Sequence, residues 1–514
     1  MDTNADGMNR AIDRCLQHHG EPDVRLCDRT ITAAAEKMKT KWRSGRNRHQ
    51  AARFCWNAFH REAEHRILPD SHDWGAVMDF TLPKDLQDYL DELDLFIEKE
   101  IMPLQNRDDN IRFFDHRREH ARTDWDNDGL PRAEWEALLA EARQIADAAG
   151  HLRFAWPKEF GGKGGSNLWM AVIREHLAAK GLGLFNDLQT EHSVVGNNPF
   201  IVMFKEFATA PQYAKYADDI LNGRLRTGFG LTEPNHGSDA TFMETRAVPQ
   251  VRDGQAGWLI NGEKMWTTGM HHANYMMTFA RTSGKDGDAS GITCFIVPTK
   301  TPGLKIEEYL WTFNMPTDHP RVSLKDVWIP EDFYWGEIGG GLPIGQSFVH
   351  QNRIRQAASS LGAAVYCINE SVAYSRQRKP FGKPLSNNQA IQWPLIELHT
   401  QAQMLRLLVR ETAVAMDTLP HKEVERQISD RVSMCNYIGN RLCCDAADQA
   451  MQTHGGMGYS RHKPFEHIYR HHRRYRITEG SEEIQMRKVG AYLFGYAGPR
   501  KNEFTQLYGP AKLS

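Results

Sequence analysis

The spacing of apolar residues changes twice along this 514-residue chain, and the change limits the possible folds more than any single motif. From about residue 79 to 226, apolar residues recur three and four positions apart, which predicts amphipathic helices. From about 227 to 330, short apolar runs are bounded by Gly, Pro and Asp, which predicts strands. Helical spacing returns from about 345. We therefore expect a mostly helical α+β protein, with a β domain between two helical ones.

Four segments follow from this pattern. Residues 1–78 form a polar, basic extension with helical stretches and no recognisable chemistry, and 79–226 form the first helical domain. Residues 227–344 form the β domain, and 345–514 form a C-terminal four-helix domain. Within the β domain, Asn261-Gly262 reads as a hairpin turn joining two short strands. Further strands are expected at Tyr275–Arg281, Ile292–Pro298 and 322–329.

Composition excludes several classes of protein. The 63 basic and 65 acidic residues leave a net charge of -2, which gives no reason to expect nucleic-acid binding. Eight cysteines without metal-ligand spacing indicate reduced thiols. No apolar run reaches transmembrane length, and the first residues resemble neither a signal nor a transit peptide. The expected location is therefore cytoplasmic.

The stretch from Arg476 to Gln485 carries a candidate general base. Ser481 suits the N-cap of a last long helix, with Glu482 in its first turn. Glu479 then precedes the helix on a turn, and Gly480 beside it lets another molecule approach the backbone. A carboxylate on such a turn suits proton abstraction. The alternative is an ordinary acidic helix start.

Three further stretches combine small, hydroxylated, aromatic or basic residues. Residues 229–239 form a turn rich in hydroxyls that could meet a polar ring or a phosphate. Residues 264–269 place Trp266 beside hydroxyls, where it could flank a planar cofactor. Residues 376–385 form a basic loop that could bind phosphate. Each is equally compatible with a structural role, and no GxGxxG or P-loop motif is present.

Together these stretches resemble the acyl-CoA dehydrogenase family over residues 79–493, which leaves the N-terminal extension outside the match. The matching motifs are TEPxxGSD at 232–239, GxKxWxT at 262–268, RxxFGxxL at 378–385, QxxGGxGY at 452–459 and EGxxxIQ at 479–485. The family fold has the same order of a helical domain, a β domain and a C-terminal four-helix domain.

The resemblance implies FAD as cofactor, bound without a Rossmann turn. Residues at the flavin and the thioester entrance would be Phe229, Leu231, Thr232, Gly237 and Ser238, while Trp266 and Thr268 would flank the isoalloxazine. Those reaching the cofactor of a neighbouring subunit would be Arg378, Pro380, Asn388, Gln389, Gln452, Gly455 and Gly456. Ser481 and Glu483 would close over the flavin.

The resemblance also implies a reaction, the α,β-dehydrogenation of an acyl-CoA thioester. Glu479 would remove the α proton while the β hydride passes to FAD, and electrons would leave to an electron-transfer flavoprotein. Substrate contacts would come from Ser238, His350, Arg353 and Gly480. Asn352 stands where some subfamilies carry the base, and it cannot act as a carboxylate. A homotetramer or homodimer is expected.

Two alternatives remain open. An acyl-CoA oxidase would return the electrons to oxygen. A flavin-carrying relative could bind nucleic acid through the basic run 461–476, although packing on a neighbouring subunit or contact with CoA phosphates is favoured for that run.

The pairs His271-His272 and His471-His472 lack ligand spacing, so we expect structural roles and no metal.

Overall fold

The computed structural model describes residues 81–187, 191–196 and 199–499. The chain divides after Thr81, and the unit described here is Leu82–Ser514. The extension expected at 1–78 lies outside the described residues, so its role stays a prediction. In the described part of the chain, no helix is both long enough and apolar enough to cross a membrane.

The first part of the unit is helical, as the apolar spacing predicts. Its longer elements are α4 (Lys84–Phe96), η2 (Ile97–Ile101), α5 (Met102–Asn106), α6 (Ala133–Ala148), α7 (Asn167–Ala179), α8 (Pro199–Phe207) and α9 (Ala210–Leu221). Two small hairpins interrupt them, namely β1 (Thr123–Asp124) with β2 (Leu130–Pro131), and β3 (Asn186–Asp187) with β4 (His192–Ser193). The stripe that begins at Leu86 faces the core, where Leu86, Tyr89, Leu90 and Leu93 are buried.

An eight-stranded sheet follows. Its strands are β5 (Thr227–Gly230), β6 (Arg246–Arg252), β7 (Gln255–Lys264), β8 (Tyr275–Arg281), β9 (Ile292–Pro298), β10 (Leu304–Tyr309), β11 (Pro320–Pro330) and β12 (Tyr334–Trp335). The order is β10-β11-β7-β6-β8-β9-β12, with β5 beside β8. The strands expected at Tyr275–Arg281 and Ile292–Pro298 have the predicted bounds.

The hairpin expected at Asn261-Gly262 is wrong, because β7 continues through both residues. The turn before β7 is instead at Asp253-Gly254, whose φ angles of 53° and 79° suit an Asp-Gly hairpin turn. Gly262 serves a different purpose, since a Cβ there would lie 2.4 Å from the Thr245 hydroxyl. The glycine lets two parts of the sheet approach closely.

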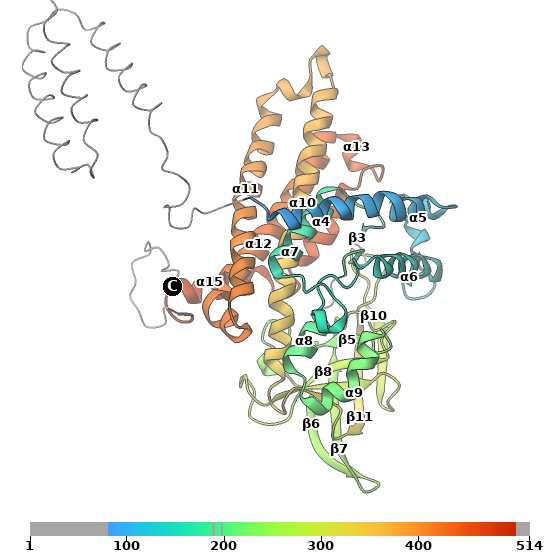
Figure 1. Ribbon diagram of the computed structural model, residues 1–514, viewed down its shortest axis with the longest axis vertical. Helices are drawn as coiled ribbons and strands as arrows, with labels where there is room; N and C mark the ends of the chain where they lie inside the picture. Colours follow the sequence, from blue (N-terminus) through green and yellow to red (C-terminus); the bar gives the residue numbers. More distant parts are fainter. Residues whose placement is uncertain (1–80, 188–190, 197–198, 500–514) are drawn as a thin grey trace, which may run out of the picture. The chain divides into compact units, whose positions relative to one another are not determined.

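The remaining elements are helices, coloured from yellow to red in Figure 1. They are α10 (Gly341–Gln377), α11 (Gln389–Thr418), α12 (His421–His454), α13 (Gly456–Tyr459), α14 (Phe465–Tyr475) and α15 (Glu482–Leu493). Helix α10 begins against the sheet, where Gly340 bridges to Ile292. It then runs between α7 and α12, and its buried residues Ile354, Ala357 and Leu361 join the core of this bundle. One long helix therefore connects the sheet with the helical core.

Candidate active site

The candidate base lies on a strained turn between α14 and α15. Glu479 has φ of 57° and Gly480 has φ of 88°, both in the left-handed region. Ser481 occupies the predicted N-cap position of α15, but its side chain forms no capping hydrogen bond. A side chain at Gly480 would place its Cβ 2.8 Å from an Arg353 nitrogen. The glycine is therefore required by both its conformation and its close contact.

Residues of α10 hold this turn in place. Arg353 donates from Nε and Nη2 to the Glu479 carbonyl oxygen, at 3.0 and 2.6 Å. Asn352 donates from Nδ2 to the Glu479 carboxylate at 3.4 Å. The sequence placed both residues near the base. The helix therefore fixes the backbone and the acid group of Glu479 from one side.

A third contact, which the sequence reasoning missed, comes from α15 itself. Gln485 is fully buried and donates to the Gly480 carbonyl at 2.7 Å and to Asn436 at 2.9 Å. The residue lies in the EGxxxIQ segment, but nothing in the local pattern indicated its buried partners. Gln485 thus positions the turn and does not merely extend the helix.

The surroundings of Glu479 suit a base. Burial raises its pKa to about 7, and the negative charge of Glu191 adds to that rise. Arg353, Asn352 and Arg474 oppose the change. In addition, the Glu479 N–H has no acceptor within the described part of the chain. The turn therefore offers a carboxylate that changes protonation near neutral pH, next to an available backbone donor.

A cavity of about 240 Å³ opens beside the turn. Its lining comes from α7, the β3–β4 hairpin, α10 and α14, and consists of Arg174, Asn186, Asp187, Glu191, Asn352, Arg355, Gln356, Ser359, His471 and Tyr475. Asn352 belongs to this lining and also contacts the Glu479 carboxylate. A small group bound in the cavity would therefore end close to the base.

Two of the sequence motifs meet at the edge of the sheet. Lys264 and Glu233, both almost fully buried, form an ion pair of 2.7 Å, and Glu233 also accepts from the Thr245 N–H at 2.9 Å. Met265 donates its N–H to the Thr232 carbonyl at 2.9 Å. The sequence did not assign roles to Glu233 or Lys264. They connect TEPxxGSD to GxKxWxT and so fix the surface that the two motifs share.

This surface has the properties that a planar cofactor needs. Trp266 adopts φ of 59° and leaves 45% of its surface exposed, while the neighbouring Thr267 hydroxyl is buried without a partner. Gly237, Ser238 and Thr268 are exposed, and Leu231 and Thr232 are partly buried. An open indole face beside available polar groups fits a flavin ring.

The same surface lies close to Glu479 along α10. Phe229 stacks on Phe348 of α10 with ring centroids 4.6 Å apart. Phe348 precedes Asn352 by one helical turn, which is about 6 Å along the axis. The two motifs and the candidate base therefore face one end of the same helix.

The basic loop after α10 lies at the other end. Phe348 and Gln377 are separated by 29 helical residues, or about 44 Å. The predicted cofactor residues beyond that point, Arg378, Pro380, Asn388 and Gln389, are largely exposed. Gln452, Gly455 and Gly456 lie at the end of α12 and are also exposed, with open space around both glycines. A single chain does not bring the basic loop to the surface around Trp266.

The remaining predicted residues have different surroundings. Glu483 is exposed in the first turn of α15, and Ser481 is partly buried. His350 is buried, and its Nε2 lies 2.8 Å from Glu425, which also binds Lys488. The histidine therefore has an internal partner.

The basic run 461–476 binds carboxylates of its own chain. Arg461 and Arg470 both pair with Glu119, at 2.9 and 3.2 Å, and Arg474 pairs with Glu191. Arg476 pairs with Glu482 at 2.9 Å. His467, His471 and His472 are buried. These contacts give four arginines of the run partners within the chain.

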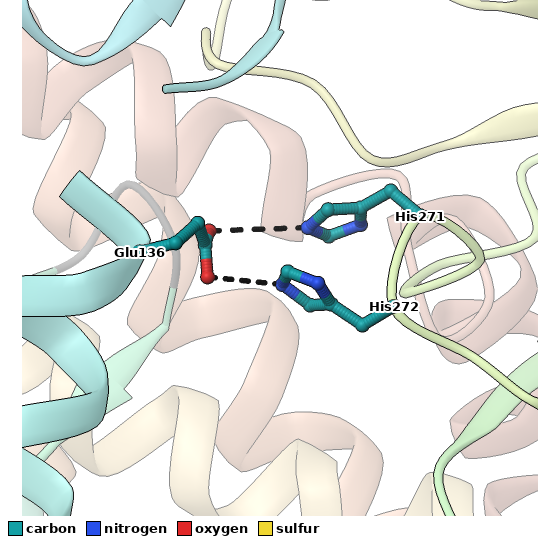
Figure 2. Close-up of side chains that lie close together, drawn as sticks. All are labelled: Glu136, His271 and His272. Atoms are coloured by element: carbon teal, nitrogen blue, oxygen red, sulfur yellow. Dashed lines mark ion pairs between the residues drawn. The ribbon is translucent and has the colours of Figure 1, made fainter. Parts of the chain in front are cut away.

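The pair His271-His272 also has an internal partner (Figure 2). The Nε2 atoms of the two rings lie 3.9 and 3.0 Å from different oxygens of Glu136 on α6. Burial alone raises the pKa of Glu136, but its bonds to both histidines outweigh this effect and lower the pKa to about 2. The three ligand atoms lie within 4.8 Å of one another. This cluster ties α6 to the segment after β7.

Comparison with known protein families matches two regions of the chain. Residues 228–327 match the model described as the acyl-CoA dehydrogenase middle domain, and residues 339–494 match the acyl-CoA dehydrogenase C-terminal domain. The matched regions contain the sheet-edge motifs, α10 and the Glu479 turn.

Individual proteins match over most of their length. A 3-(aryl)acrylate reductase of Clostridium sporogenes is 31% identical, over 67% of this chain and 87% of the relative. The caffeyl-CoA reductase-Etf complex subunit CarC of Acetobacterium woodii is 28% identical, over 66% and 85%. The structure of butyryl-CoA dehydrogenase from Megasphaera elsdenii superimposes with a TM-score of 0.65 at 27% identity, covering 81% of this chain and 100% of that one.

Proposed function

The chain belongs to the acyl-CoA dehydrogenase family of FAD-dependent oxidoreductases, and on that premise we propose that it dehydrogenates an acyl-CoA thioester between its α and β carbons. The observation that carries this proposal is Glu479. It is held by Arg353 and Asn352, its pKa lies near neutrality, and Asn352, which contacts its carboxylate, also lines the cavity.

Each part of the site then has a task. FAD, when bound, supplies the acceptor for the β hydride. Glu479 takes the α proton, and its free N–H donates to the thioester oxygen, where negative charge develops. Arg353 and Gln485 are positioning residues, because they hold the turn through its carbonyl groups. Trp266 and Thr268 would flank the isoalloxazine of bound FAD, and Thr232 would line the flavin and the thioester entrance.

We further propose that the cofactor site needs two chains. Arg378 stands at the opposite end of α10 from Phe348, about 44 Å away, which exceeds the reach of one side chain. Helix α11 also exposes large apolar side chains at helical spacing, namely Trp393, Ile396, Met404 and Leu407. Although polar residues interrupt this stripe between Ile396 and Met404, exposed apolar side chains grouped on one helix are typical of a protein interface. A homodimer or homotetramer would cover the stripe and complete the site with the neighbour's basic loop.

The structure constrains the protein that exchanges electrons with the flavin less than it constrains the substrate site. An electron-transfer flavoprotein is suggested by the CarC relative, whose name places it in a complex with Etf. The names of two relatives also contain the word reductase. The same site serves enoyl reduction when the partner supplies electrons, because Glu479 then returns the α proton.

The test is the visible flavin spectrum of the purified holoenzyme, before and after anaerobic addition of acyl-CoA thioesters. We expect one class of thioester to bleach the flavin bands within the mixing time. A fully loaded protein that no thioester bleaches, and that no enoyl-CoA reoxidises after chemical reduction, contradicts the proposal.

A further inference from the structure

The cavity beside Glu479 contains two arginines that lack partners. Arg174 of α7 and Arg355 of α10 both line it and are each 7% exposed. Neither forms a hydrogen bond or an ion pair with any residue in the described part of the chain. A buried arginine is nearly always paired, because an isolated buried charge is costly. Two such residues in one cavity therefore require an explanation.

The carboxylates in the cavity wall do not explain why the two arginines are buried there. Asp187 is bound by Arg122 at 2.6 Å, and both side chains are buried. Glu191 is bound by Arg474 and accepts a hydrogen bond from the Tyr475 hydroxyl at 3.2 Å. Glu191 also attracts the Arg174 guanidinium electrostatically, but within the described residues neither acid forms a hydrogen bond or an ion pair with Arg174 or Arg355.

Other buried polar atoms of the cavity wall have no hydrogen-bond partner in the described part of the chain, and they also favour a ligand that accepts hydrogen bonds. The Asn186 amide nitrogen is buried without a partner, and so are both ring nitrogens of His471. Burial lowers the pKa of His471 well below its ordinary value, so the neutral ring has one N–H to donate. Together with the guanidinium groups, these atoms offer several donors to a group that brings mainly acceptors.

The position of Arg355 on α10 places its positive charge near the candidate base. Arg355, Gln356 and Ser359 follow Asn352 by three, four and seven residues, so all four lie on one face of α10. Arg355 stands about 5 Å along the helix from Asn352, which contacts the base. A group held by Arg355 therefore lies within a short acyl chain of the α carbon.

The protonation states agree with this geometry. Burial lowers the pKa of Arg174, and burial together with repulsion from Arg174 lowers the pKa of Arg355 to about 9. A pKa of about 9 keeps Arg355 charged at neutral pH. An anion placed between them would relieve the repulsion and replace the lost hydration.

Resting on the proposed function, we infer that the acyl group carries a carboxylate at the end remote from the thioester, and that Arg174 and Arg355 bind this carboxylate inside the cavity. The substrate is then the CoA thioester of a short dicarboxylic acid. Two oxygens with about four lone-pair directions match the forked donors of guanidinium groups. An alkyl chain ending in a methyl group would instead leave both charges buried and unpaired.

The experiment uses the FAD-loaded full chain and sets of thioesters matched in length. Each set contains the ω-carboxyacyl-CoA, the methyl-ended acyl-CoA and the ω-carboxamide, for example adipyl-, hexanoyl- and adipamoyl-CoA, with shorter sets beside it. We measure kcat/KM from anaerobic flavin reduction. We expect a preference of about 100-fold or more for one ω-carboxyacyl-CoA, because two charged hydrogen-bond partners are gained.

Variants then assign the preference to the two arginines. Arg355→Met and Arg174→Met should each lower kcat/KM for the ω-carboxyacyl-CoA by about tenfold to 100-fold. The methyl-ended thioester should react as well as before or better. Arg406→Met is the matched control, because Arg406 pairs with Glu175 on the α7–α11 contact and does not line the cavity. Flavin content and melting temperature confirm that each variant is folded.

The possible outcomes separate the two proposals. If no thioester bleaches the flavin and no enoyl-CoA reoxidises the reduced flavin, the proposed function fails. If methyl-ended thioesters react as well as ω-carboxyacyl ones, the function stands and the inference is overturned. Equal reaction of the carboxamide would overturn the role of charge, and unchanged selectivity in both arginine variants would overturn their assignment. The wild-type comparison alone decides the matter if a variant does not fold.

Discussion

Glu479 and Glu482 are three residues apart, yet their carboxylates have opposite surroundings. Glu482 pairs with Arg476 and Arg441, at 2.9 and 3.0 Å, and these bonds lower its pKa to about 2. Glu479 has only the amide of Asn352 at 3.4 Å on its carboxylate, and burial raises its pKa to about 7. The nearby arginine, Arg353, binds the Glu479 carbonyl and not the acid group.

The difference extends to the arginines of the two regions. Around Glu482, charges are paired and the helix start is stabilised. Around Glu479 and the cavity, Arg174 and Arg355 form no hydrogen bond or ion pair with any described residue, and the acid is left easy to protonate. Paired charges hold a structure together, whereas unpaired buried charges are costly and are kept where a ligand or a proton must be received.

The largest expected effect comes from Glu479→Gln. The amide keeps the shape of the turn but cannot accept the α proton, so flavin reduction should slow by about 10³-fold or more, with FAD still bound. Stopped-flow absorbance of the flavin measures this rate. The matched variant Glu482→Gln should reduce the flavin at nearly the normal rate. Similar slowing in both variants would contradict the contrast between the two acids.

Glu482→Gln should instead lower stability. Its loss leaves Arg476 and Arg441 without their carboxylate, and we expect the free energy of unfolding to fall by about 2 kcal/mol. Urea unfolding followed by circular dichroism measures the change. A stability equal to that of the wild type would show that the paired region does not hold the start of α15.

The two acids also predict opposite pH dependence. Glu479, with its pKa raised, is protonated below pH 7, so the rate of flavin reduction should rise about tenfold per pH unit and level off above 7. Its folded state binds the extra proton between about 4.5 and 7, so its contribution to stability decreases as pH rises through that window. Glu482, with its pKa lowered, contributes stability above 4.5 that is lost as pH falls toward 2.

Rates measured from pH 5 to 9 in wild type and in Glu482→Gln test the assignment. The rise centred near pH 7 should persist in the variant, because it belongs to Glu479. If the rise near pH 7 disappears in Glu482→Gln, the titrating group is Glu482 and not Glu479.

The smallest expected effect is a gain in stability from Arg355→Met. The change removes an unpaired buried charge and keeps most of the volume, so the substrate-free protein should become more stable by about 1 kcal/mol. Arg476→Met is the matched comparison and should lose stability, because its partner Glu482 would stay buried. Thermal unfolding of both variants without substrate measures the difference. A loss in both would mean that Arg355 has a stabilising partner.

The local sequence pattern was sufficient to predict some elements of the fold and not others. The predicted stripe from Leu86 to Phe96 lies on a helix and faces the core, and the strands at Tyr275–Arg281 and Ile292–Pro298 have the predicted bounds, because each buries a face set by its own period. The Asn261-Gly262 turn failed for a long-range reason. Its glycine is needed by the approach of Thr245, which no local window contains.

The candidate site likewise contains residues that the sequence located and contacts that it did not show. The sequence located Glu479, Gly480, Arg353 and the sheet-edge motifs, because these residues lie in short segments with recognisable composition. It did not show that Gln485 holds the Gly480 carbonyl or that Glu233 binds Lys264. Glu233 and Lys264 are 31 residues apart, and although Gln485 is only five residues from Gly480, its contact depends on the left-handed turn at Glu479 and Gly480, which apolar spacing does not show.

By itself the sequence determined the order of helices and strands, the turn that carries the candidate base, and the family to which the chain belongs. Only the tertiary structure decided which charges are satisfied. Arg174, Arg355 and Asn186 come from separate segments, and their unpaired state depends on how α7, the β3–β4 hairpin and α10 pack around one cavity. Burial and pairing are properties of that packing, and they set the pKa of Glu479 and the character of the cavity beside it.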